Sequence, residues 1–115
     1  MGLFKKTKKM KFNEYKNTRS KGIMTSYEKM NYFFIQDDSD AELFKIGKNI
    51  LAGFPVLVGL EKVNNRRANE ILAFLTGVVF ASDGDYIKMD EKIYLFARKE
   101  EFEDGSLRQY AKDSK

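Results

Sequence analysis

The feature that most constrains this chain is a helix stop signal followed at once by a strand-length apolar run. Before the stop, apolar residues recur at helical spacing, at positions 43, 46, 47, 50 and 51, and form one stripe of a predicted helix. Gly53 and Pro55 end that helix, and residues 54–60 are almost wholly apolar, which is typical of a central strand. An aromatic and β-branched run at 32–35 precedes the helix. Together these segments predict a β-α-β unit with two parallel strands.

Local signals set the starts of two helices and the position of a hairpin. Ser39, with Glu42 three residues later, is a capping-box pattern. Asn64 can cap a second helix, whose residues 68, 71, 72, 75, 78 and 79 are apolar at helical spacing. Residues 86–89 and 93–97 flank a tight turn. The expected fold class is α/β, a small two-layer sandwich in the order β-α-β-α-β-β, with two helices against a mixed sheet.

The second predicted helix carries more apolar surface than one packing partner requires. Phe74, Gly77 and Ala81 form a second stripe on another side of it, and Phe80 widens this stripe. A helix that is apolar on two sides is buried from two directions. A domain of roughly 85 residues has too little mass to cover both sides by itself. We therefore expect a homodimer with Phe74, Gly77 and Ala81 at the interface.

Charge divides the chain into two parts. Residues 1–22 contain eight lysines and arginines against one glutamate, a net charge of +7, so the remaining residues carry −3 of the total +4. A basic arm on a slightly acidic body indicates a polyanionic partner that the arm alone contacts. That partner is either nucleic acid or the anionic inner leaflet of a membrane.

The arm itself favours the membrane. On a helix over residues 1–12, apolar and basic side chains would occupy different parts of the circumference. The predicted membrane-binding residues are Leu3, Phe4, Lys5, Lys6, Lys8, Lys9 and Met10. A nucleic-acid contact and a solvated basic tail remain the alternatives. Residues 13–29 are interpreted as a flexible linker and 30–98 as the core. Residues 99–115 are interpreted as a charged, frayed tail, in which a short helical turn around 107–111 is the alternative.

Composition argues against an enzyme. The chain has no cysteine and no histidine, which removes the usual ligands of zinc, haem and iron–sulfur sites and the mechanisms that depend on either residue. The acidic clusters at 37–40 and 83–85 are ordinary turn formers, and no phosphate-binding glycine-rich loop is present. No cofactor or metal is expected. Without an apolar run long enough to span a bilayer, the expected location is cytoplasmic.

Three segments resemble the SepF family of cell-division proteins. They are residues 54–62, residues 68–77 and residues 83–89 with 93–95, and the resemblance covers roughly residues 30–98. Its most recognisable pieces are the segment 74–77, the Gly84 turn and the strand at 93–95. The chain differs from the usual family pattern at Gly59, at Glu70 and Ala73, and at Ala97 and Arg98.

The resemblance implies a specific biological role. In that family a membrane-targeting helix and a linker precede a small α/β dimer that binds the C-terminal tail of the tubulin-like division protein FtsZ. The implied function is a non-enzymatic adaptor that tethers FtsZ filaments to the inner face of the cell membrane at the division site. The dimers could form a higher polymer. Tyr94 and Phe74 are the expected contacts for the FtsZ tail, and the alternative function is a nucleic-acid-binding module that uses the basic arm.

Overall fold

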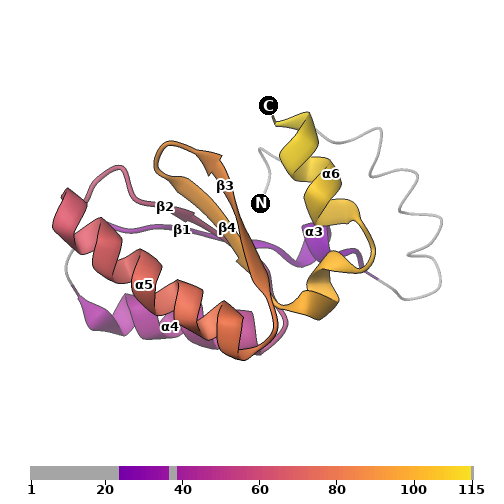
Figure 1. Cartoon of the computed structure of the whole chain (residues 1–115), viewed down its shortest axis with the longest axis horizontal. Helices are drawn as coiled ribbons and strands as arrows, with labels where there is room; N and C mark the ends of the chain where they lie inside the picture. The colour runs from indigo at the N-terminus through magenta and orange to yellow at the C-terminus, as the bar shows by residue number, and fades with distance from the viewer. Residues whose placement is uncertain (1–23, 37–38, 115) are drawn as a thin grey trace.

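The computed structural model describes residues 24–36 and 39–114. The predicted membrane-binding residues of the arm lie outside these ranges. The described elements, in chain order, are α3 (Ser26–Lys29), β1 (Asn31–Phe34), α4 (Asp40–Leu51), β2 (Val56–Gly59), α5 (Asn65–Ala81), β3 (Asp85–Asp90), β4 (Ile93–Ala97), the 3₁₀ helix η1 (Lys99–Phe102) and α6 (Ser106–Asp113) (Figure 1).

The strands form one mixed sheet in the order β1-β2-β4-β3. β1 and β2 are parallel, as the β-α-β pattern predicts, and β4 is antiparallel to both β2 and β3. Val58 at the centre pairs with Phe33 on one side and Tyr94 on the other. The predicted α/β class, strand order along the chain and terminal hairpin are therefore confirmed.

Both predicted helix starts are confirmed by their caps. The Ser39 hydroxyl accepts a hydrogen bond from the Ala41 amide at 3.2 Å, and the Asn64 side chain accepts one from the Arg67 amide at 2.8 Å. Arg67 also donates to Asp40 at 2.9 Å. This contact joins the first turns of α4 and α5, so the two helices begin side by side.

One face of the sheet packs against α4 and α5. The buried side chains of this layer alternate along the strands, as one-sided packing requires. They include Ile46, Ile50, Val56, Val58, Ile71, Leu75 and Phe96. This cluster is the main core of the domain.

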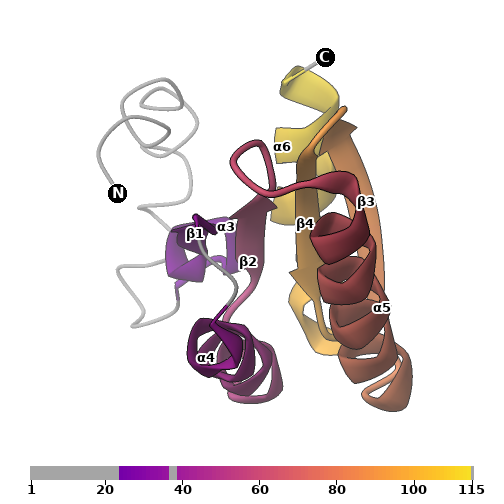
Figure 2. The ribbon, with the colours of Figure 1, turned by 90° about the vertical axis from the view of Figure 1, so that its left-hand side faces the viewer.

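The opposite face of the sheet also has a helical layer. The domain therefore has helices on both faces of the sheet, and the expected two-layer sandwich accounts for only one of these helical layers. In Figure 2, β4 lies between α5 and α6. Buried residues of α3 and α6 pack against the strand residues that point away from α4 and α5; the cluster comprises Tyr27, Met30, Leu57, Leu95, Ala97, Leu107 and Tyr110. The predicted linker is therefore wrong from Thr25 to Lys29, and the predicted frayed tail is wrong over η1. The helical turn considered around 107–111 is present as the longer, packed helix α6.

Hydrogen bonds and an ion pair fasten α3 to the segment that leads into α6. The Ser26 amide donates to Asp104 at 2.8 Å, and the Tyr27 amide donates to the Ser106 hydroxyl at 3.0 Å. Lys29 pairs with the buried carboxylate of Glu101 at 2.9 Å. Loss of water around Tyr110 raises the pKa of its hydroxyl to about 12. The two ends of the described chain are thus joined through a dry contact.

Gly84, between α5 and β3, lies close to the backbone at the end of β4, and its substitution tests this close approach. A Cβ there would collide with the Ala97 carbonyl oxygen and lie 2.9 Å from the Arg98 Cα, both backbone atoms. Gly84→Ala is therefore expected to lower the free energy of unfolding by about 2–3 kcal/mol in urea titrations. Gly77→Ala is the control, because a Cβ there meets nothing within 4 Å, and it should be neutral or stabilising by up to ~1 kcal/mol. Equal midpoints for the two variants would contradict the close approach.

Candidate functional site

The outer side of α4 and α5 carries an exposed apolar surface. Two adjoining hollows indent it, and their apolar lining residues are Phe44, Gly47, Leu51, Ala73, Phe74, Gly77, Val78 and Ala81. We call this surface the α4–α5 face. The rings of Phe44 and Phe74 lie 5.8 Å apart across it. Phe44 is 53% exposed and the neighbouring Phe80 is 83% exposed, which is unusual for side chains of this size.

This surface brings together the three residues expected at an oligomer interface. Phe74, Gly77 and Ala81 line one hollow. Sequence reasoning missed the contribution of α4. Leu51 was expected in the core stripe and is instead largely exposed beside the hollow, because it closes the last turn of α4. Phe44 was the available signal, because it lies three residues before Gly47 and seven before Leu51 and so widens the apolar stripe of that helix.

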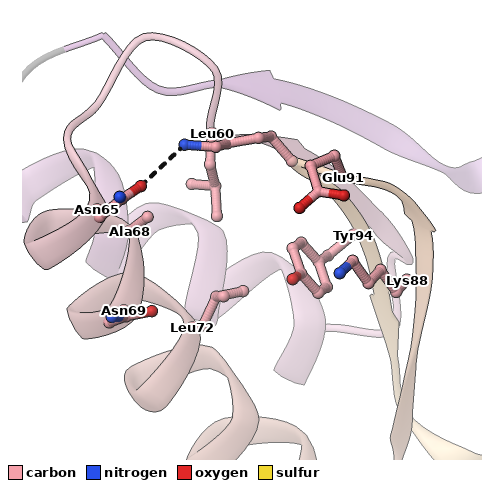
Figure 3. A pocket seen from close by; sticks show the side chains of 9 residues that line it. Leu60, Asn65, Ala68, Asn69, Leu72, Lys88, Glu91 and Tyr94 are labelled. Atoms are coloured by element: carbon pink, nitrogen blue, oxygen red, sulfur yellow. Dashed lines mark hydrogen bonds between the residues drawn. The ribbon is translucent and has the colours of Figure 1, made fainter.

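A second pocket lies on the other side of α5, next to the β3–β4 hairpin. Its lining residues are Leu60, Asn65, Ala68, Asn69, Leu72, Lys88, Glu91, Lys92 and Tyr94. Figure 3 shows the Tyr94 ring facing Leu72, with Lys88 beside it. The ammonium group of Lys92 donates to the Asn65 side chain at 3.1 Å. We call this the Tyr94 pocket.

The Tyr94 pocket combines apolar side chains with the positively charged groups of Lys88 and Lys92 and the negatively charged group of Glu91. Tyr94 has two aromatic neighbours, Tyr86 at 6.2 Å and Phe96 at 6.3 Å between ring centroids. The amides of Asn65 and Asn69 can donate and accept hydrogen bonds. Such a pocket suits a peptide segment with an apolar side chain and a backbone or carboxylate to bind.

The structure separates Phe74 from Tyr94, the two residues expected to contact one peptide. Phe74 lies on the α4–α5 face, whereas Tyr94 faces Leu72 in its own pocket. Leu72 and Phe74 are two positions apart and therefore point to nearly opposite sides of α5. The described residues thus offer two distinct surfaces.

Other classes of site find no support in the described part of the chain. Among residues 24–36 and 39–114, no three histidine, cysteine or acidic side chains gather as a metal site would require. None of the helices described there is both long and apolar enough to cross a bilayer.

A comparison with protein families identifies the family of this chain. The model of the family described as "Cell division protein SepF" matches residues 35–100. The chain belongs to the SepF family. The matched region contains both the α4–α5 face and the Tyr94 pocket, whereas α3, β1 and α6 lie outside it.

Curated relatives agree with this assignment. The chain is similar to the "Cell division protein SepF" of Natranaerobius thermophilus, 38% identical over 66 residues that cover 57% of this chain and 40% of that protein. The corresponding proteins of Carboxydothermus hydrogenoformans and Latilactobacillus sakei are 32% and 36% identical over 69 residues. Those matches cover 60% of this chain and 50% and 46% of the relatives. The match thus spans half or less of the length of these relatives.

Proposed function

We propose that this SepF-family chain is a non-enzymatic adaptor that tethers FtsZ filaments to the inner face of the cell membrane at the division site. Membership of a family of cell-division proteins is the observation that carries the proposal. The basic arm of residues 1–12 is the membrane anchor, and the body supplies the protein contacts. Each anchor is weak, but an oligomer presents several at once, so assembly and membrane attachment reinforce each other.

The arrangement of the termini and pockets supports a bridging role. Met24, where the arm joins the described body, is 49% exposed and precedes α3. α3 packs on the sheet face opposite to α4 and α5. The described body therefore begins on one side of the sheet, while the α4–α5 face and the Tyr94 pocket lie on the other. A body oriented in this way can contact lipid and a protein filament at the same time.

The α4–α5 face is the proposed dimer contact. Gly77→Lys should convert the dimer to a monomer, because it places a charged side chain in the apolar hollow. The change also replaces a helical glycine, so the monomer should stay folded. Light scattering coupled to size exclusion gives the mass. Asn69→Lys, at an exposed position of α5 that lines the Tyr94 pocket and not this hollow, is the control and should remain dimeric; a dimeric Gly77→Lys variant would refute this interface.

The Tyr94 pocket is the proposed site for the FtsZ tail. Tyr94→Ala should weaken binding of an FtsZ tail peptide about thirtyfold, the ~2 kcal/mol typical of a lost hot spot. Tyr86→Ala is the control, because Tyr86 contacts Tyr94 but does not line the pocket, and it should change affinity less than about threefold.

Calorimetric titration measures both affinities, after circular dichroism and mass have shown that each variant is folded and assembled. Equal affinities of wild type and Tyr94→Ala would remove Tyr94 from the site. Phe74→Ala, tested in parallel, reports whether the peptide also reaches the α4–α5 face. Absence of binding by the wild type would refute the FtsZ contact itself.

A further inference from the structure

One row of apolar positions crosses the sheet on the α3 and α6 side at the hairpin end. Phe34 pairs with Gly59, and Gly59 pairs with Ile93. Met89 on β3 points to the same side, since it packs with the buried cluster of that face. We call these four residues the Phe34 row.

Solvent reaches the Phe34 row, whereas Leu57, Leu95 and Ala97 on the same sheet face are buried. Phe34 is 50% exposed, and Ile93 and Met89 are partly exposed. The Phe34 ring lies over Gly59, where a Cβ would collide with the ring. Figure 1 shows α6 over one end of the sheet and the turn of the β3–β4 hairpin at the other. The helical layer thus leaves this row partly exposed, with Phe34 covering Gly59 and with Ile93 and Met89 only partly buried against the cluster.

The chain's own N-terminal arm starts on the same side of the sheet. Hydrogen bonds of Ser26 to Asp104 and of Tyr27 to Ser106 fix α3 beside α6, so the arm begins at Met24 from a defined place. The twelve residues from Phe12 to Met24 can span up to ~40 Å. Four strands at ~4.8 Å spacing make a strip only about 15 Å wide. Residues 1–12 can therefore reach every part of the Phe34 row.

The chemistry of the arm also suits this surface. Residues 1–12 contain Leu3, Phe4, Met10 and Phe12, and residues 1–22 carry a charge of +7 against −3 for the remainder. Apolar side chains that are exposed on both partners gain about 25 cal/mol for each Å² they bury together. Long-range attraction between the oppositely charged parts raises the local concentration of the arm at the body.

We propose that residues 1–12 fold back onto the Phe34 row of their own chain when no membrane is present. The same apolar side chains would otherwise enter the lipid boundary, so body and membrane compete for one segment; this part of the inference rests on the proposed membrane anchor. The apparent affinity for lipid then equals the intrinsic affinity multiplied by the fraction of arms that are free. The back-folded arm also keeps an apolar segment covered before the protein reaches its target.

Paramagnetic relaxation in the full-length chain tests the contact directly. The chain has no cysteine, so Thr7→Cys gives a single attachment point for a spin label. Methionine methyl groups labelled with ¹³C then report at Met89 in the row and at the buried Met30. The label should broaden Met89 in the absence of lipid, and anionic vesicles should restore its signal. In an equal mixture of spin-labelled chains and separate methyl-labelled chains, Met89 should stay sharp.

A pair of matched phenylalanine variants provides the control. Phe34→Lys should abolish the broadening of Met89 and raise apparent affinity for anionic vesicles about threefold to tenfold. Phe54→Lys, at an exposed phenylalanine that lines neither the α4–α5 face nor the Tyr94 pocket, should do neither. An unchanged Met30 signal confirms that each variant is folded. A sharp Met89 in the labelled wild type, or broadening in the mixture, would overturn the proposal. Because the relaxation measurement needs no lipid, it stands even where the membrane anchor itself fails.

Discussion

Deleting residues 1–12 is expected to abolish binding to anionic vesicles, with a loss of affinity of more than about a hundredfold. Each lysine near an anionic surface contributes ~1 kcal/mol, and the segment contains Lys5, Lys6, Lys8, Lys9 and Lys11. Its apolar residues add their burial in the lipid boundary. All of these side chains lie outside the described body, so the truncated chain should keep its circular dichroism spectrum. Co-sedimentation with vesicles measures the loss.

Three controls separate the possible partners of the arm. Leu3→Gln with Phe4→Gln removes apolar insertion and keeps the charge, so the remaining binding should become strongly salt-dependent. Vesicles of neutral lipid should bind the wild type only weakly. DNA should not bind; wild-type binding to DNA but not to anionic vesicles would instead support the nucleic-acid-binding alternative. A truncated chain that still sediments with vesicles would remove the anchor assignment.

Leu107→Ala is expected to lower the free energy of unfolding by about 2–5 kcal/mol. Leu107 is fully buried between α6 and the sheet, so truncation leaves a cavity beneath the helix. Such a change is a large fraction of the stability of a small domain. Urea denaturation followed by circular dichroism gives the value.

Lys112→Ala, also in α6, is the matched control. Lys112 is exposed, and its replacement should change the free energy by less than about 0.5 kcal/mol. If both variants had the midpoint of the wild type, the segment beyond η1 would be a frayed tail and the second helical layer would not exist in solution.

Strong local signals made the central part of the fold predictable. The caps at Ser39 and Asn64, the stop at Gly53 and the hairpin each act over a few residues, so their physics can be evaluated from the sequence. The structure confirms each of them. The β-α-β connection then left few arrangements of the sheet, because such crossovers have one preferred hand.

The second helical layer could not be anticipated in the same way. α6 contains only eight residues, and its apolar positions Leu107, Tyr110 and Ala111 stand among charged neighbours. Three positions at helical spacing are too few to distinguish a packed helix from a solvated turn. The partner of α6 is α3, which lies far away in sequence. Only the folded sheet brings the two together.

The same distinction between local signals and long-range contacts applies to the candidate sites. The second stripe of α5 was visible in the sequence because helical periodicity determines which residues share a side, and Phe74, Gly77 and Ala81 do share one hollow. The position of Phe74 relative to Tyr94 depends on the rotation of α5 above β4. That rotation is determined by side-chain packing throughout the core, which the sequence pattern of one helix does not reveal. The two residues therefore lie on different surfaces.

Recruitment of FtsZ to vesicles tests the proposed adaptor function most directly. FtsZ filaments are mixed with anionic vesicles and with the wild-type chain, the chain lacking residues 1–12, or Tyr94→Ala, and the vesicles are recovered by flotation. The account predicts that FtsZ floats with the vesicles only when the chain retains both the arm and Tyr94. It would be contradicted if the wild-type chain floated with the vesicles while FtsZ remained behind in solution.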